Sequence, residues 1–102
     1  MRKKMHETEY RASRVCRVLG NPTAYAIVKA LLKKGMSPGM LAAGIGMSLP
    51  LVSATLRTLR NVDVVRYETR GNEKTYYVKD KAVVEMCRAL EYFVDRMRRK
   101  SF

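Results

Sequence analysis

Tryptophan and glutamine are absent from this chain, and asparagine occurs only three times, at Asn21, Asn61 and Asn72. Few thermolabile amides beside many lysines and arginines point weakly to a thermophilic source, although the seven methionines weaken that inference. No apolar run approaches the length of a membrane-spanning helix, and no hydrophobic segment follows the basic N-terminus as a secretory signal requires. We therefore expect a protein of the cytoplasm with no membrane partner.

Residues that carry chemistry are also scarce. The chain has one histidine, His6, and two cysteines, Cys16 and Cys87. We find no nucleophile with a histidine beside it, no glycine-rich phosphate loop and no carboxylate pair suited to acid–base catalysis. Two cysteines and one remote histidine do not supply a soft-metal site. The sequence therefore predicts a protein that is not an enzyme, with no metal, no cofactor and no evident small-molecule substrate.

Acidic residues are the third shortage. Lysine and arginine number 21 against 9 aspartates and glutamates, which gives a net charge of +12 and a pI of about 10.2. A chain this basic needs a polyanionic partner, and nucleic acid is the commonest one. The alternatives are a basic surface that is simply solvated, and docking on an acidic protein.

The apolar pattern predicts short helices in a single domain. Residues 1–7 are expected to form a basic tail, and residues 8–20 a helix that Gly20 ends. Asn21 followed by Pro22 is a helix-start signal. This second helix is expected to close at Lys33-Lys34-Gly35, with the glycine in the left-handed conformation.

A helix-turn-helix pattern follows. Ser37 can cap a short helix that begins at Pro38 and ends at a left-handed Gly46. A second helix is expected from Pro50 to Asn61, with an outward face of small side chains and arginine. Such a face suits the major groove of DNA, because short side chains allow close approach and arginine pairs with guanine or phosphate. The DNA contacts expected in this segment are Ser48, Pro50, Ser53, Ala54, Arg57, Thr58 and Arg60.

Between Val64 and Val78 the pattern changes to that of strands, interrupted by the turn sequence Arg70-Gly71-Asn72-Glu73. A hairpin directly after a helix-turn-helix is more often a wing that touches phosphate or the minor groove, although charged residues also protect exposed strand edges. Residues 22–79 would then form a winged helix-turn-helix core. The DNA contacts expected on the wing are Arg66, Arg70, Asn72 and Lys74, and Lys79 completes its basic rim.

Asp80 can cap a last helix over residues 81–98, whose apolar residues follow a heptad seam. The apolar stripe is broad and extends to the chain end, so we expect a helix–helix dimer contact; the alternative is that this helix only closes its own core. The expected dimer contacts, on this helix and on residues 8–20, are Tyr10, Val15, Cys16, Leu19, Val83, Cys87, Leu90, Val94 and Met97.

Three groups of residues carry a family resemblance. They are Leu19-Gly20-Asn21-Pro22-Thr23 with Ile27-Val28 and Leu31; Met40-Leu41-Ala42, Ile45-Gly46-Met47-Ser48, Val52-Ser53, Leu56, Leu59 and Val64-Val65; and Gly71 with Tyr76-Tyr77. Over about residues 8 to 98 the chain resembles the ArsR/SmtB type of winged-helix repressor and, more loosely, the MarR class. The resemblance implies a mainly α fold with a β-hairpin, and a homodimer joined by its first and last helices. It also implies that Pro50–Asn61 lies in the major groove and that the hairpin is a wing.

The resemblance does not extend to metal sensing. Metal-sensing members carry a Cys-x-Cys pair in the first helix of the motif, or Asp, His and Glu clusters on the last helix. Here the first segment, residues 38–43, has no ligand side chain, and the last helix has no histidine. If the first and last helices pack as in the family, Cys16 and Cys87 would lie at one interface. Each cysteine is then either an inert packing residue or half of a redox pair.

The sequence thus predicts a homodimeric, sequence-specific regulator that binds double-stranded DNA, expected to be a repressor. Two alternatives remain at this stage: a winged-helix module for protein interaction, and an architectural nucleic-acid binder without sequence readout. Leu49 and the lack of asparagine and glutamine on the recognition face favour the alternatives. Ser53, Arg57 and Thr58 favour specific readout.

Overall fold

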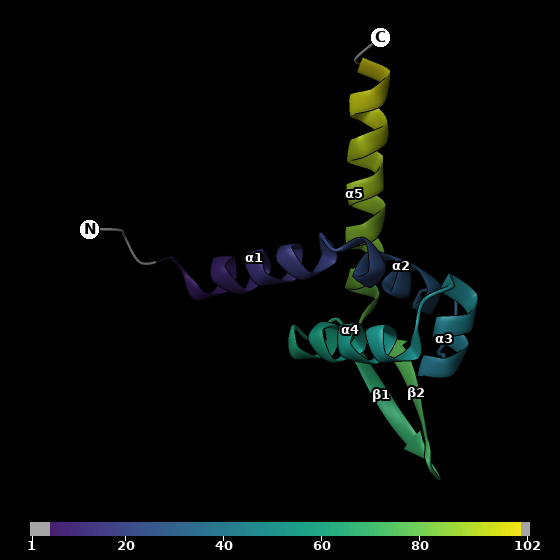
Figure 1. The fold of residues 1–102 in the computed structure, drawn as a ribbon. Helices are drawn as coiled ribbons and strands as arrows, with labels where there is room; N and C mark the ends of the chain where they lie inside the picture. The colour runs from purple at the N-terminus through teal and green to yellow at the C-terminus, as the bar shows by residue number, and fades with distance from the viewer. Residues whose placement is uncertain (1–4, 101–102) are drawn as a thin grey trace.

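The computed structural model describes residues 5–100, and this part of the chain consists of five helices and one β-hairpin (Figure 1). In chain order the elements are α1 (Glu7–Leu19), α2 (Pro22–Leu31), α3 (Pro38–Ile45), α4 (Leu49–Asn61), β1 (Val65–Arg70), β2 (Glu73–Val78) and α5 (Lys81–Lys100). The predicted fold class, mainly α with a β-hairpin, is confirmed. Residues 1–4 of the expected tail lie outside the described residues, and Glu7 of that tail already belongs to α1.

Side-chain caps explain where the helices begin. The Oδ1 atom of Asn21 accepts a hydrogen bond from the backbone N–H of Ala24 at 3.1 Å, directly before Pro22. The Oδ1 atom of Asp80 accepts one from Ala82 at 2.8 Å, as predicted for the start of α5. His6, expected in the tail, caps α1. A cap satisfies a backbone donor that the helix itself leaves unpaired, so these starts are encoded locally.

The core lies where α2, α3, α4 and β1 meet. No polar or charged residue is buried in the described part of the chain. Val52, Leu56 and Leu59 all point into this core, as predicted, so α4 is anchored along one complete face. The largest fully buried side chains are Ile27, Val28, Leu41, Val52, Leu56, Leu59, Val65 and Cys87.

The end of α2 differs from the prediction. Helix α2 ends at Leu31, and Gly35 is not among the residues with positive φ, so it is not a left-handed cap. A Cβ at Gly35 would lie 3.1 Å from the side chain of Thr75 and 3.2 Å from the carbonyl oxygen of Tyr76. Glycine therefore suits the close approach of this loop to β2, because a Cβ would be tightly packed there, a tertiary reason that local helix signals do not contain.

The hairpin pairs β1 and β2 in antiparallel register from Val65 with Val78 to Arg70 with Glu73. Its two-residue turn has a positive φ of 62° at Gly71, the first turn position, where glycine carries no steric penalty. Met36 adds a short bridge to β2 by exchanging backbone hydrogen bonds with Tyr76 at 2.8 and 2.9 Å. The base of the hairpin is thus fixed to the loop before α3.

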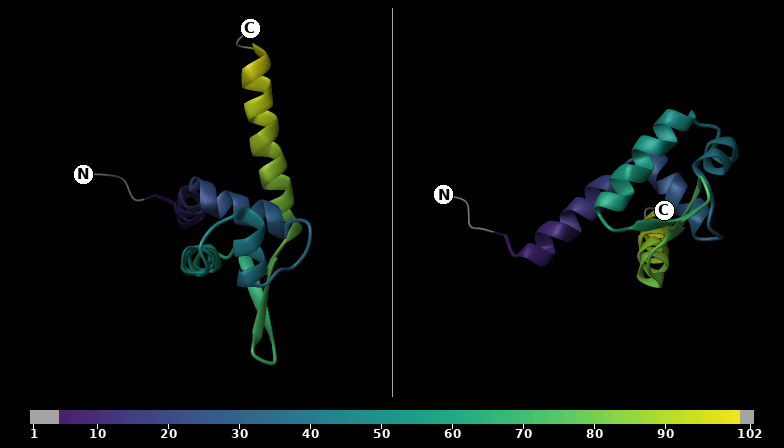
Figure 2. Two further views of the ribbon diagram at one scale, coloured as in Figure 1. Left: turned by 45° about the vertical axis from the view of Figure 1, so that its right-hand side comes forward. Right: turned by 90° about the horizontal axis from the view of Figure 1, so that it is seen from below.

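The hairpin and α5 project from opposite sides of the core, and α1 extends sideways from it (Figures 1 and 2). The described chain accordingly extends over 47 × 41 × 24 Å. Most of α5 and much of α1 are therefore uncovered in the single protomer. The helix-turn-helix and the hairpin lie on the side away from the free end of α5.

Candidate nucleic-acid interface

The helix-turn-helix forms as predicted from its sequence. The hydroxyl of Ser37 accepts a hydrogen bond from Met40 at 3.2 Å and starts α3, which ends at Gly46 with a φ of 70°. The hydroxyl of Ser48 then accepts one from Leu51 at 3.3 Å and starts α4 at Leu49, one residue before the predicted start. Helices α3 and α4 are bent by 115° relative to each other.

Helix α4 presents the expected small and basic side chains to solvent. Its buried stripe leaves Ala54, Arg57 and Thr58 on the opposite, exposed side. The hydroxyl of Thr58 donates a hydrogen bond to the carbonyl of Ala54 at 3.2 Å, so it retains its methyl group and acceptor capacity for a partner. Of the expected α4 contacts, Ser48, Pro50, Ala54, Arg57 and Thr58 are exposed, and Ser53 and Arg60 are partly buried.

Arg60 has a second role that the sequence pattern did not indicate. Its guanidinium lies 5.2 Å from the centre of the Tyr67 ring, on β1, and the ammonium of Lys74 lies 4.6 Å from the same ring. Tyr67 also packs against Tyr76 at 5.2 Å. These contacts connect α4 to the hairpin, so the orientation of the hairpin depends on α4.

Asp63 organises the base of the hairpin. It has a positive φ of 69°, and its carboxylate lies 2.7 Å from Arg66 and 2.6 Å from Lys79. The hydrogen bond from Lys79, helped by the charges of both cations, lowers the pKa of the Asp63 carboxyl. Two of the four basic side chains on the rim are therefore partly neutralised at the base of the hairpin.

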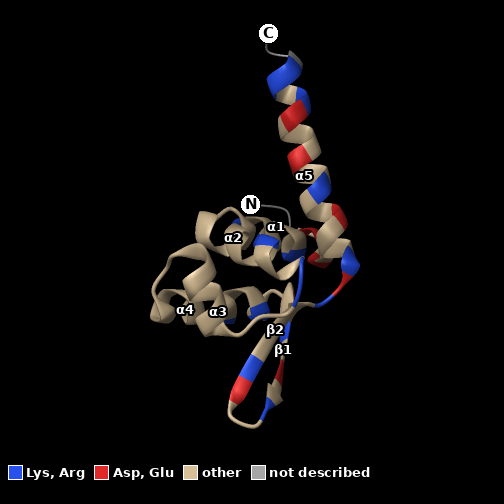
Figure 3. Cartoon of the chain, turned by 90° about the vertical axis from the view of Figure 1, so that its right-hand side faces the viewer, with Lys and Arg blue, Asp and Glu red and all other residues tan. Residues whose placement is uncertain are grey.

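The remaining cations of the hairpin lie toward its tip. The side chain of Arg70 is 84% exposed and lies 3.9 Å from Glu68, and Lys74 and Asn72 are also exposed. Figure 3 shows acidic and basic residues together on the hairpin, whereas α3 and the adjoining end of α4 carry neither. The hairpin can thus contact phosphate through Arg70 and Lys74, which fits the predicted wing.

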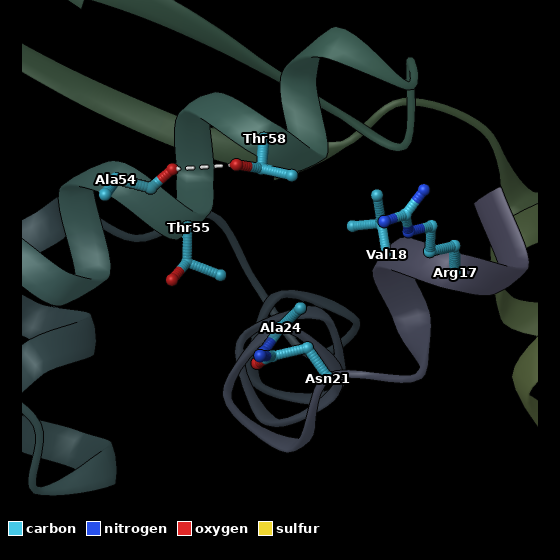
Figure 4. Close-up of a pocket in the computed structure, with 7 residues that line it drawn as sticks. All are labelled: Arg17, Val18, Asn21, Ala24, Ala54, Thr55 and Thr58. Atoms are coloured by element: carbon cyan, nitrogen blue, oxygen red, sulfur yellow. Dashed lines mark hydrogen bonds between the residues drawn. The ribbon is translucent and has the colours of Figure 1, made fainter. Parts of the chain in front are cut away.

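The structure has a groove between α1 and α4 that the sequence analysis did not predict. A pocket of about 320 Å³ opens there, and Figure 4 shows side chains of both helices around it. A second pocket shares Arg17, Val18 and Thr58 with it, and a third overlaps the second. Together they extend the groove along α1, where Arg11, Arg14 and Arg17 recur at intervals of three. The three-residue spacing of these arginines could have predicted a basic side of α1 from the sequence, because residues three apart share a helix face. The lining residues of the first pocket are Arg17, Val18, Asn21, Ala24, Ala54, Thr55 and Thr58.

Helix α5 is tied to α2 by a polar cluster. The carboxylate of Glu91 accepts hydrogen bonds from the hydroxyl of Tyr25 at 2.6 Å and from Lys29 at 3.0 Å. The hydrogen bond from Lys29, followed by that from Tyr25, lowers the pKa of the Glu91 carboxyl. Burial, together with the bond to Glu91 and the nearby Cys87 thiol, raises the pKa of Tyr25.

The expected dimer contacts stay a prediction, but the protomer itself already covers three of these residues. Leu19, Val83 and Cys87 are buried within the protomer, at 7%, 8% and 0% exposure, because the core covers them, so they add little area to a dimer contact. Leu90, Val94 and Met97 of the seam remain exposed, as does Phe93 beside them.

The expectation that both thiols lie at one interface stays a prediction. Cys16 is exposed on α1, whereas Cys87 is buried in the core, and both are free thiols. A Cys16–Cys87 redox pair stays a prediction that would require Cys87 to leave the core. In residues 5–100 no three His, Cys, Asp or Glu side chains come together as a group able to hold a metal ion.

No single described helix is long and apolar enough to cross a membrane. Helices α3 and α4 reach such a composition only together, and the sharp bend at the turn separates them. The feature reflects the lack of charged residues in α3, the turn and the first half of α4.

Comparisons with known proteins identify the fold. No protein-family model matches the chain, and no curated protein matches it in sequence. The structure is similar to the homodimeric winged helix-turn-helix DNA-binding domain of Mb0332 from Mycobacterium bovis, described as a possible ArsR-family transcriptional regulator. That match has a TM-score of 0.81 at 20% identity and covers 95% of this chain and 93% of that chain.

Two further solved structures are similar to this one. NolR from Sinorhizobium fredii matches with a TM-score of 0.79 at 25% identity, over 91% of this chain and 96% of that one. The transcriptional repressor BigR from Xylella fastidiosa matches with a TM-score of 0.74 at 23% identity, over 85% and 92%. The chain therefore has a winged helix-turn-helix fold of the kind found in ArsR-like regulators, as its sequence motifs predicted.

Proposed function

We propose that this protein is a homodimeric regulator of transcription that binds double-stranded DNA in a sequence-specific manner and acts as a repressor. Helix α4 is the recognition helix, and the β1–β2 hairpin is the wing. The observation that carries the proposal is the exposed face of α4, where Ala54, Arg57 and Thr58 follow one another on a helix whose other face is fully anchored. A rigid helix with small side chains and one free arginine can enter the major groove closely.

The electrostatics support the same function. The net charge of +12 supplies attraction to phosphate, and exposed cations at Arg57, Arg70 and Lys74 lie on the elements that flank a groove in winged-helix proteins. Arg11, Arg14 and Arg17 on α1 extend this basic surface beside α4. Two of the similar solved structures also support this function, because the Mb0332 domain is described as homodimeric and DNA-binding, and BigR as a repressor.

The exposed apolar side of α5 supports the dimer. Leu90, Phe93 and Val94 are 44%, 59% and 52% exposed in the protomer, and they follow one another toward the free end of the helix. A second copy of this helix would cover them by two-fold symmetry, and the symmetry would place two α4 helices on one side. A regulator of this kind acts in the compartment that holds the DNA, in keeping with the expected cytoplasmic location.

The decisive experiment is selection of bound fragments from a pool of random duplex DNA with the full chain. We expect an enriched inverted repeat whose half-site centres lie about one helical turn, ~34 Å, apart. Affinity for the enriched site should fall steeply with salt, with a log–log slope beyond about −5 if ~6–10 phosphates are contacted.

Two other results would reject the proposal in different ways. Tight, salt-dependent binding without any enriched sequence would leave an architectural nucleic-acid binder. Failure to bind duplex DNA at low salt would leave a winged helix that docks on another protein, an alternative that the uncharged surface of α3 and early α4 favours.

A further inference from the structure

The helix-turn-helix contains a long uncharged segment in an otherwise highly charged chain. Charged residues make up 29% of the sequence, yet none occurs from Gly35 to Leu56, which spans α3, the turn and the first half of α4. Figure 3 shows the same region without a basic or acidic residue. The first cation that α4 can offer to a base is Arg57, about two turns after the helix begins.

Four large apolar side chains in this segment are not used by the core: Met40 on α3, which is 46% exposed, and three around the start of α4. Met47 in the turn is 41% exposed, and Leu49 and Leu51 in the first turn of α4 are 50% and 43% exposed. The core takes Val52 and Leu56 from the same helix and leaves these three around its N-terminal end. We call Met47, Leu49 and Leu51 the apolar tip. Its exposure leaves it available to an apolar group of a partner.

The position of the apolar tip decides which partner fits. In helix-turn-helix proteins the first residues of the recognition helix contact the base edges. The thymine 5-methyl is the apolar group that base pairs present in the major groove, whereas purine edges are recognised by Arg, Lys, Asn or Gln. The apolar tip contains none of those four residue types.

The other exposed side chains of α4 fit a DNA groove better than an apolar protein surface. Pro50, Ala54 and Arg57 lie four and three residues apart and so share one exposed side of α4. Leu49 and Leu51, two residues apart, lie on either side of Pro50 at the start of α4, so a partner that reaches the apolar tip along this side also meets small side chains and a guanidinium. A groove with thymine methyls next to guanine or phosphate oxygens satisfies both parts of this surface.

We propose that the apolar tip of Met47, Leu49 and Leu51 recognises thymine 5-methyl groups in the major groove, so that each half-site is thymine-rich where α4 begins. The proposal rests on the proposed function and adds the class of sequence that α4 selects. Arg57 then recognises the neighbouring base pairs toward the other end of the helix.

The test uses the full chain and the site enriched from random DNA. Each thymine of a half-site is replaced in turn by deoxyuridine, which keeps the base pairing and removes only the methyl group. Binding is measured by fluorescence anisotropy at fixed salt. We expect two or more replacements in each half-site to weaken binding about fourfold each, as the loss of one buried methyl predicts.

Matched variants assign the effect to the apolar tip. Leu49→Ala and Leu51→Ala keep the fold because both side chains are half exposed, and each should abolish the difference between thymine and uracil at one position. Arg57→Ala is the control: it should weaken binding to both kinds of DNA and leave the thymine–uracil difference intact.

The outcomes separate the two proposals. An enriched site whose affinity is unchanged by uracil at every position overturns the role of the apolar tip and leaves the proposed function standing. A uracil effect that persists at full size in Leu49→Ala, Leu51→Ala and Met47→Ala also overturns it, because a residue outside the apolar tip then contacts the methyl groups. If no sequence is enriched, the proposed function and this inference fail together.

Discussion

Single side chains on α4 and the hairpin differ in what they can recognise. Arg57 is exposed near the middle of the recognition face, whereas Arg60 is held over Tyr67 and Arg66 is paired with Asp63. The sequence pattern treated these arginines alike, because a helix period reports which side a residue is on and not what lies opposite it. The tertiary contacts leave Arg57 as the arginine of α4 that is free to select a base.

Arg57 and Arg70 should therefore respond differently to truncation. Arg57→Ala is expected to cost about 1–3 kcal/mol on the enriched site and to relax preference at one or two base pairs, because a base contact is lost. Arg70→Ala should weaken binding to enriched and random duplexes by similar factors, because phosphate contacts carry no sequence information. Anisotropy titrations on both duplexes measure this. Equal losses on both duplexes for Arg57→Ala would contradict its assigned role.

The two thiols should differ in reactivity. Cys16 is exposed and Cys87 is fully buried, so a thiol reagent should label one cysteine per native chain quickly and two in denaturant. Cys16→Ser should remove the fast reaction, and Cys87→Ala should leave it unchanged. Equal native rates for the two thiols would show that Cys87 leaves the core readily, as the redox pair requires.

At the scale of elements, α5 is the helix whose role the structure changes most. The heptad pattern predicted one continuous dimer seam, but its first two positions, Val83 and Cys87, belong to the protomer core. Beyond them the helix leaves the core, and the cluster of Tyr25, Lys29 and Glu91 holds that junction to α2. The same periodicity therefore serves two different contacts along one helix.

The Glu91 cluster predicts a dependence of stability on pH. Because the pKa of Glu91 is lower in the folded protein than its ordinary value of 4.5, its contribution is present above that value and is lost as the pH falls through the lowered pKa. The decrease in thermal midpoint between pH 7 and pH 3 should therefore be smaller in Glu91→Gln than in the native chain.

Glu85→Gln is the matched control, because Glu85 is also exposed on α5. It should leave most of the acid-induced decrease in place. Circular dichroism melts of the three proteins give the comparison. An identical pH profile in Glu91→Gln and the native protein would mean that the cluster does not stabilise the α2–α5 junction.

At the scale of the whole molecule, α5 and α1 project from the core and are largely uncovered in the single protomer. The exposed apolar side of α5 lies on the part of the molecule away from the hairpin and the start of α4 (Figure 2). A dimer formed through α5 would leave both DNA-binding surfaces free. Its geometry would then set the spacing between two recognition helices.

The dimer is tested by placing a charge on the apolar side of α5. Leu90→Glu should shift the protein from dimer to monomer at micromolar concentration in analytical ultracentrifugation, because a carboxylate would be buried unpaired at the contact. The protomer should remain folded, since Leu90 is 44% exposed. Tyr92→Glu, two residues away on the other side of the helix, should remain dimeric. A native protein that sediments as a monomer would contradict the dimer.

The sequence by itself determined the local features of this protein. Caps at Asn21, Ser37 and Asp80, the left-handed Gly46 and the turn glycine Gly71 act within a few residues, so these helix starts, the helix-turn-helix and the hairpin were predictable. The inward face of α4 was predictable as well, because burial follows the helix period.

Only the tertiary structure determined which other side chains are buried or held by contacts and which are exposed to a partner. It buried Cys87 and Val83, held Arg60 over Tyr67, made Gly35 a point of close approach to β2, and formed the arginine-lined groove between α1 and α4. Each of these depends on which element packs opposite a residue far away in the chain. A periodic pattern gives the direction of a side chain relative to its own helix, and only the packing of the whole chain determines what that side chain meets.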